Sequence, residues 1–102
     1  MYTIEYLPIA RRDMVDIAKY IGVRLTNPDA ADRSAEEMIE FAEKLTDMPY
    51  KCPMYIPVKP LKHEYRKLIV QNYIMFYCID EDKKLVTTAR VVYSGRDYEK
   101  LL

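Results

Sequence analysis

The chain has 102 residues, half of them apolar, and its 16 basic side chains balance its 16 acidic ones. This length predicts one domain over residues 1–102, because domains typically run to about 100–150 residues. No stretch reaches the ~18 uninterrupted apolar residues of a membrane span, and the N-terminus has neither the basic start nor the apolar run of a signal peptide. We therefore expect a cytoplasmic protein that has no membrane partner.

Glycine, histidine and cysteine are scarce, which excludes several kinds of site. The two glycines of the chain cannot form a Gly-rich phosphate-binding loop. One histidine, His63, and two distant cysteines, Cys52 and Cys78, cannot supply a four-ligand zinc site. In a cytosolic protein we expect both thiols to stay reduced. The sequence therefore predicts no metal site and no cofactor.

Charge is unevenly distributed along the chain. Residues 1–48 carry six basic and ten acidic side chains, a balance of −4, whereas residues 49–102 carry ten and six, a balance of +4. The basic excess is sharpest from Lys51 to Lys67. It predicts an anionic partner, either nucleic acid or an acidic protein segment, with a solvated loop as the alternative. Seven of the ten tyrosines lie in the same half, and tyrosine is favoured at interfaces and for base stacking.

The first half of the chain predicts a strand followed by two helices. Residues 2–6 alternate and are rich in β-branched and aromatic side chains, which indicates a short strand. Pro8 suits the first turn of a helix, and an apolar stripe at helical spacing continues to about Gly22. Asn27-Pro28 predicts the N-cap and first turn of a second helix that runs to about Asp47. We therefore expect an αα-hairpin.

The second half predicts an antiparallel meander. Four prolines between residues 49 and 60 exclude a helix or a central strand, so this proline segment is expected to be an extended surface connection. Strand-like runs follow over 65–70, 73–79 and 85–93, separated by breaks of hairpin length. A short helical or irregular tail over 96–102 closes the chain. The expected fold is α+β, in which the N-terminal strand joins the three-stranded meander in a four-stranded sheet and the αα-hairpin packs on it.

The middle strand of the meander is apolar on both faces. Its alternate side chains form two sets, Tyr73, Met75 and Tyr77 on one face and Ile74, Phe76 and Cys78 on the other. A sheet with helices on one side normally leaves its second face polar, so an apolar second face predicts a partner molecule that covers it. The alternative is that the proline segment or the tail folds over this face.

Three segments of the second half resemble a known toxin family. They are residues 65–70 (YRKLIV), 72–77 (NYIMFY) and 90–98 (RVVYSGRDY). With the order of the elements, they resemble the RelE/ParE superfamily of toxins from type II toxin–antitoxin (plasmid stabilisation) modules over the whole chain. The resemblance implies a RelE-like fold and a cognate antitoxin protein, whose C-terminal segment wraps the toxin.

The superfamily divides by target, and the resemblance leaves the target open. One branch cleaves mRNA on the ribosome, and another poisons DNA gyrase. We expect growth arrest by ribosome-dependent mRNA cleavage, carried out by a metal-independent endoribonuclease, because that activity is the broader one in the superfamily. Inhibition of DNA gyrase by protein contact and a non-toxic antitoxin-binding relative are the alternatives.

Metal-free RNA cleavage requires a base for the ribose 2′-OH, a cation for the phosphorane and an acid for the 5′-oxygen. Arginine suits the second task because its planar fork pairs with phosphate oxygens. The resemblance implies an arginine and a nearby tyrosine in such roles at Arg96 and Tyr98. The catalytic candidates are Arg66, Arg96, Tyr98, Arg90 and His63, with Glu64 as a further proton carrier. The RNA- or partner-binding candidates are Lys59, Lys62, Lys67, Tyr73, Met75 and Tyr77.

Two positions depart from the ribonucleolytic pattern. Ile74 and the nearby Leu68 stand where ribonucleases of the family often carry basic residues. This departure, and a neutral overall charge, favour a gyrase-type or variant mechanism more than the resemblance alone does.

Several candidates also have a purely structural interpretation. Arg90 could pair with an acidic helix residue such as Glu40 or Glu43, and Tyr98 could pack over the helical hairpin. His63 could be a solvated loop residue.

Overall fold

The computed structural model describes residues 1–24, 26–57, 59–96 and 98–102. In chain order the elements are β1 (Thr3–Tyr6), α1 (Pro8–Lys19), η1 (Tyr20–Arg24), α2 (Pro28–Glu43), η2 (Lys44–Thr46), β2 (Arg66–Val70), β3 (Tyr73–Asp80), β4 (Leu85–Tyr93) and η3 (Glu99–Leu101). Each predicted strand agrees with a strand of the structure to within one residue at either end. The second helix ends earlier than predicted, because a 3₁₀ turn replaces its last residues. The predicted proline segment and tail each include one residue, 58 and 97, outside the described residues.

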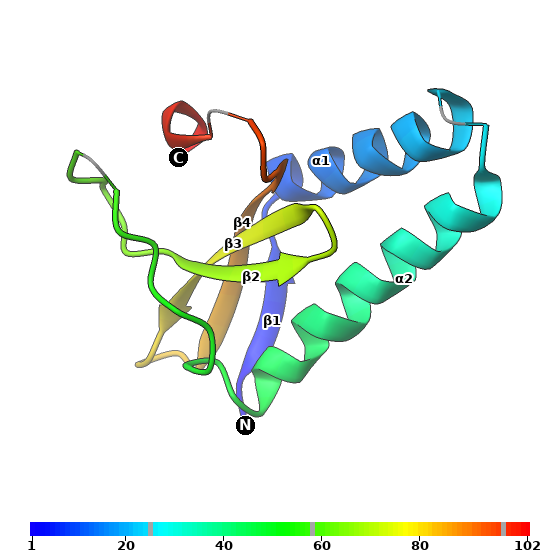
Figure 1. The fold of residues 1–102 in the computed structure, drawn as a ribbon. Helices are drawn as coiled ribbons and strands as arrows, with labels where there is room; N and C mark the ends of the chain where they lie inside the picture. Colours follow the sequence, from blue (N-terminus) through cyan, green and yellow to red (C-terminus); the bar gives the residue numbers. More distant parts are fainter. Residues whose placement is uncertain (25, 58, 97) are drawn as a thin grey trace.

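The four strands form one mixed sheet in the order β1-β4-β3-β2 (Figure 1). β1 runs parallel to β4, and the β2–β3 and β3–β4 pairs are antiparallel. The expected α+β fold, with the N-terminal strand added to a three-stranded meander, is confirmed. β1 pairs only with Leu85–Thr88, so no described strand pairs with residues 89–93 of β4 on the edge opposite β3.

The two helices form the predicted hairpin and cover one face of the sheet. Asn27 caps α2 as expected, since its Oδ1 accepts a hydrogen bond from the Ala30 amide at 3.2 Å. At the tip of the hairpin the helices approach closely, because a Cβ on Gly22 would lie 3.4 Å from the Ala31 Cβ. From that tip α1 and α2 diverge toward opposite ends of the sheet, as Figure 1 shows.

The main core lies between the helices and the sheet. Met38, Ala42 and Leu45 from α2 and η2 pack against the strands. The strand residues of this core are Leu68, Val70, Met75, Tyr77, Val86 and Val91. The helix-facing side of the middle strand is therefore the Tyr73, Met75 and Tyr77 side.

The second face of the sheet is also covered, and the chain itself covers it. Tyr65, Ile74, Phe76, Ala89 and Val92 are buried there in a second cluster. Apolar side chains of the proline segment and the tail close this cluster: Tyr55, Leu61, Tyr98, Leu101 and Leu102. The expectation that a partner covers this face is wrong, and the alternative that the proline segment and the tail fold over it is correct.

Candidate functional site

The strand tyrosine Tyr77 and its neighbour Met75 lie in the core rather than at a surface. Tyr77 is 0% exposed and Met75 is 1% exposed. The Tyr77 hydroxyl donates a hydrogen bond to the Pro49 carbonyl oxygen at 2.6 Å, which fastens the start of the proline segment. Burial raises the pKa of Tyr77, so it stays a neutral donor. Their predicted role as partner-binding residues is corrected to a structural one, because the helices cover this face.

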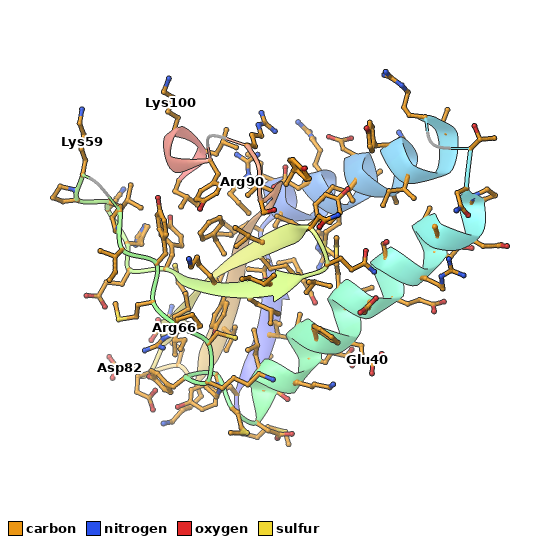
Figure 2. All side chains as sticks on the ribbon, viewed as in Figure 1. Glu40, Lys59, Arg66, Asp82, Arg90 and Lys100 are labelled. Carbon is orange, nitrogen blue, oxygen red and sulfur yellow. The ribbon has the colours of Figure 1, made fainter. Side chains whose placement is uncertain are left out.

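Arg90 is held by a carboxylate of α1. Its Nε and terminal nitrogen donate to the two Asp13 carboxylate oxygens at 2.8 and 3.0 Å, and Asp13 Oδ2 also accepts the Val91 amide at 2.9 Å. Both side chains are largely buried, at 15% and 13% exposed. Asp13 therefore caps the edge of β4 beyond the end of β1. An acidic helix partner is confirmed, but it comes from α1, whereas Glu40 points outward from α2 (Figure 2).

Arg66 is also occupied by the protein. Its guanidinium donates to the carbonyl oxygens of Cys52 at 2.7 Å and Tyr50 at 3.3 Å, and it lies 5.0 Å from the centre of the Tyr50 ring. These contacts tie the start of β2 to the turn that follows η2. A guanidinium held in this way stabilises the proline segment.

Tyr98 lies on the face of the sheet opposite the helices. Its ring centre is 5.1 Å from that of Phe76 and 5.7 Å from that of Tyr55. The structural interpretation that placed Tyr98 over the helical hairpin is therefore wrong about the face. The Lys67 ammonium lies on the same side, 5.9 Å from the centre of the Tyr55 ring.

His63, Lys59, Lys62 and Glu64 are exposed. The His63 ring makes an edge contact with Tyr65 at 6.2 Å. Lys59 projects from the far end of the proline segment, well away from both Arg66 and Arg90 (Figure 2). The exposed basic loop predicted from the sequence is therefore present.

Arg96 and Tyr73 line the same pocket. This pocket has a volume of about 480 Å³ and lies between α1 and the upper part of β4. Its polar and aromatic lining comprises Asp13, Asp16, Tyr20, Asn72, Tyr73, Tyr93 and Arg96. The ring centres of Tyr73 and Tyr93 are 6.1 Å apart in an edge-to-face contact. Burial raises the pKa of Tyr73, and the neighbouring hydroxyls of Tyr20 and Tyr93 raise it further.

The five catalytic candidates do not converge on one place. β3 separates Arg66 on β2 from Arg90 on β4, and the two guanidiniums bind different partners, the Cys52 carbonyl oxygen and the Asp13 carboxylate. Arg96 lines the pocket beside α1, whereas Tyr98 packs on the opposite face and His63 is on the loop before β2. A general base must lie within about 3 Å of the proton that it removes, with the stabilising cation beside it. The described residues contain no such arrangement among these candidates.

A second pocket, which the sequence did not reveal, opens beside the free edge of β1. It has a volume of about 350 Å³ and is lined by Ile4, Tyr6, Arg11, Met14, Ile39 and Glu43. The Tyr6 hydroxyl is buried and is the one such side-chain atom without a hydrogen-bond partner in the described part of the chain. Burial raises its pKa, and so does the nearby Glu43 carboxylate. The one sequence signal for this pocket was Ile39, an apolar residue beside the buried stripe of α2. The Ile39 side chain is 44% exposed.

The free edge of β1 adds backbone groups to this second pocket. The amides of Thr3 and Leu7 donate to β4, to the carbonyl oxygens of Lys84 and Thr88. Because backbone groups of successive strand residues point to opposite sides, those of Ile4 and Tyr6 face away from β4. The opposite sheet edge, on β2, is partly covered, since the Lys67 amide donates to the Pro53 carbonyl oxygen at 3.0 Å. β1 therefore offers the more open edge.

A carboxylate at the β3–β4 turn joins three segments of the chain. Glu81 accepts hydrogen bonds from Tyr50 at 2.5 Å, from Tyr2 at 2.7 and 2.9 Å, and from the Lys84 ammonium. The hydrogen bonds from Lys84, Tyr50 and Tyr2 lower the pKa of Glu81 to about 2, and the bond to Glu81 raises the pKa of Tyr50 to about 12. This Glu81 cluster is exposed and anchors the N-terminus to the turn after η2.

No group of three or more His, Cys, Asp or Glu side chains is placed to hold a metal ion in the described ranges. No helix in those ranges is long and apolar enough to cross a membrane.

A protein-family model matches most of the chain. The model of the family described as the ParE toxin of type II toxin-antitoxin system, parDE, matches residues 4–98. No curated protein sequence matches the chain.

Several solved structures share the fold. The chromosomal ParDE toxin–antitoxin system from P. aeruginosa aligns with a TM-score of 0.73 at 16% identity, over 91% of this chain and 96% of that one. The RelBE2 toxin–antitoxin complex from Mycobacterium tuberculosis aligns with a TM-score of 0.62 at 24% identity, over 90% and 96%. The archaeal RelE–RelB complex from Pyrococcus horikoshii aligns with a TM-score of 0.61 at 14% identity, over 93% and 97%.

Proposed function

The chain belongs to the ParE toxin family of type II toxin–antitoxin systems, and from that premise we propose that it arrests growth by binding DNA gyrase. In this proposal the toxin acts in the cytoplasm by protein contact, and a cognate antitoxin silences it. Cleavage of mRNA is the competing activity.

The separation of the catalytic candidates carries the choice of protein contact over RNA cleavage. Arg90 is held by Asp13, and Arg66 Nη1 is held by two backbone carbonyl groups, so contacts within the protein already engage both guanidinium groups. Arg96 and Tyr98 lie on different sides of the sheet. In addition, the face that carries Tyr98 is filled by the proline segment and the tail, which leaves it closed to an RNA chain.

The second pocket and the free edge of β1 together form a groove, and this groove beside β1 supports capture by an antitoxin. An extended peptide can add to the Ile4–Tyr6 edge through main-chain hydrogen bonds and insert an apolar side chain among Met14 and Ile39. A polar group on that peptide would satisfy the buried Tyr6 hydroxyl. Exposed basic residues such as Lys62 supply contacts for acidic residues of the same partner.

The target is tested by inducing the chain in cells with and without its antitoxin. We expect filamentation and a DNA-damage response, with transcript 5′ ends unchanged. Because protein contact needs no proton carrier, His63→Ala and Tyr98→Phe should stay toxic. New 5′ ends in ribosome-bound transcripts, lost on either substitution, would establish RNA cleavage and contradict the proposal.

The antitoxin groove is tested with two matched substitutions of exposed isoleucines. Ile39 lines the groove and is 44% exposed, whereas Ile69 is 59% exposed on β2, outside the groove. Ile39→Asp should weaken antitoxin binding by about tenfold or more, because a carboxylate cannot enter an apolar pocket unpaired. Ile69→Asp should leave binding unchanged. Equal effects of the two substitutions would mean that the antitoxin binds elsewhere.

A further inference from the structure

The pocket between α1 and β4 lies against a stretch of the β4 edge with which no described strand pairs. The Ser94 amide donates to the Asn72 carbonyl oxygen at 2.8 Å, and this fixes the hydrogen-bonding phase of the β3–β4 pair. Residues 90, 92 and 94 therefore bond toward β3, and the backbone groups of Val91 and Tyr93 point away from it. β1 ends at Tyr6, opposite Thr88, so the described strands leave this part of the edge uncovered.

Two backbone groups on this edge face the pocket. Of the four backbone groups of Val91 and Tyr93 that point away from β3, two have partners: the Val91 amide donates to Asp13 Oδ2, and the Tyr93 carbonyl oxygen accepts a hydrogen bond from the Arg96 amide at 3.0 Å. The other two groups are the Val91 carbonyl oxygen and the Tyr93 amide, and both residues line the pocket. They present one acceptor and one donor, side by side along an extended strand.

An acceptor next to a donor is complementary to the Watson–Crick edge of adenine. That base carries an amino donor beside a ring-nitrogen acceptor, and protein pockets read a base through this edge. The rings of Tyr20, Tyr73 and Tyr93 line the same pocket and supply flat surfaces on which a base can stack. A volume of about 480 Å³ is in the usual range for small-molecule pockets.

The charge of the pocket wall suits a nucleotide better than a bare base. Asp13 is neutralised by Arg90, which leaves Asp16 and Arg96 as the exposed charges of the lining. A guanidinium pairs with phosphate oxygens, and a carboxylate accepts hydrogen bonds from ribose hydroxyls. The edge, the rings and these charges occur together in one pocket.

We propose that the pocket between α1 and β4 binds an adenine nucleotide, with the base on the Val91 carbonyl oxygen and the Tyr93 amide and the phosphate on Arg96. This site shares no lining residue with the pocket beside β1. Its test measures nucleotide binding by the purified chain, so its outcome does not depend on the proposed function.

The test is a titration of the full chain with 5′-AMP, in which calorimetry and amide NMR measure the binding. We expect saturable binding and a large shift of the Tyr93 amide resonance. Inosine monophosphate reverses the donor and acceptor of the base edge, so it should bind at least about tenfold more weakly. No saturable binding, an unmoved Tyr93 amide, or equal affinity for the two nucleotides would overturn the proposal.

Substitutions separate the base contact from the phosphate contact. Arg96→Gln should weaken 5′-AMP binding by about tenfold and leave adenosine binding unchanged. Tyr20→Ala should weaken both ligands, whereas Val15→Ala, at an exposed position of α1 outside the pocket, should weaken neither. Equal effects of Tyr20→Ala and Val15→Ala would also overturn the proposal.

Comparison with a short oligoadenylate identifies the source of the adenine. Tighter binding of the oligoadenylate than of 5′-AMP would mean that the base arrives in single-stranded RNA. Equal binding would mean a free mononucleotide. Both results support the base pocket.

Discussion

Replacing Asp13 by alanine should be among the most damaging changes outside the apolar core. The substitution removes the partner of the Arg90 guanidinium and the acceptor for the Val91 amide in one step. Both charged side chains are largely buried, at 15% and 13% exposed, so water can replace the lost carboxylate only in part.

The expected cost follows from these contacts. Breaking a buried ion pair costs about 3–5 kcal/mol, and an unpaired buried amide about 1–3 kcal/mol. The remaining exposure allows partial hydration, so we expect a loss of about 3 kcal/mol in the free energy of unfolding. For a chain of this length that corresponds to a fall of about 15 °C in Tm.

Urea unfolding of the wild-type chain and three variants measures this loss. Asp16→Ala is the matched control, because Asp16 is an exposed carboxylate on the same helix, and it should change stability by less than about 0.5 kcal/mol. Adding Arg90→Met to Asp13→Ala should recover about 2 kcal/mol, since the unpaired charge is removed. Equal stabilities of the Asp13→Ala and Asp16→Ala proteins would refute this account of the β4 edge.

Three further outcomes follow from the structure. The pKa of Glu81 is about 2 in the folded chain and about 4.3 in unfolded chains. Its contribution to stability is therefore present above about pH 4.3 and is lost as the pH falls toward 2. Glu81→Gln should flatten acid unfolding curves over that range. Burial raises the pKa of the Cys78 thiol to about 11. At pH 8 its alkylation, measured by mass spectrometry, should therefore be roughly a hundredfold slower than that of an exposed cysteine. Alkylation at the rate of a free thiol would mean that the sheet face opposite the helices opens readily. A Cβ at Gly95 would lie 2.5 Å from Tyr93 Cε2, so Gly95→Ala should displace that exposed ring at little cost in stability and move the Tyr73 ring resonances; unchanged resonances would count against the contact.

The sequence predicted the fold well because local signals and tertiary structure agree. The Asn27 cap, the alternation of the strands and the break at the proline segment all appear where they were expected. Their order along the chain agrees with the resemblance that residues 65–98 carry. The end of α2 was missed by a few residues, because helix ends depend on neighbouring packing more than on local composition.

The candidate site was predicted less well, because the period of a strand does not say which face meets the helices. Tyr77 and Phe76 are both apolar enough for either core, and both are buried. The signal that the second face would be closed was available in Tyr55, Leu61 and Leu101, apolar residues of the proline segment, of the loop that follows it and of the tail.

Long-range pairs were beyond the reach of sequence patterns. Arg90 and Asp13 are 77 residues apart, and the pair depends on β1 ending before the top of β4, so that α1 reaches the strand edge. The same early end of β1 creates the pocket beside Tyr93. Nothing in the composition of either strand predicts it.

Supercoiling by purified DNA gyrase, measured with increasing amounts of the purified chain, tests the central claim most directly. The account predicts that the wild-type chain inhibits supercoiling, that Tyr98→Phe inhibits it equally, and that an excess of antitoxin restores it. Full supercoiling activity at saturating toxin, together with cleavage of mRNA on purified ribosomes, would contradict it.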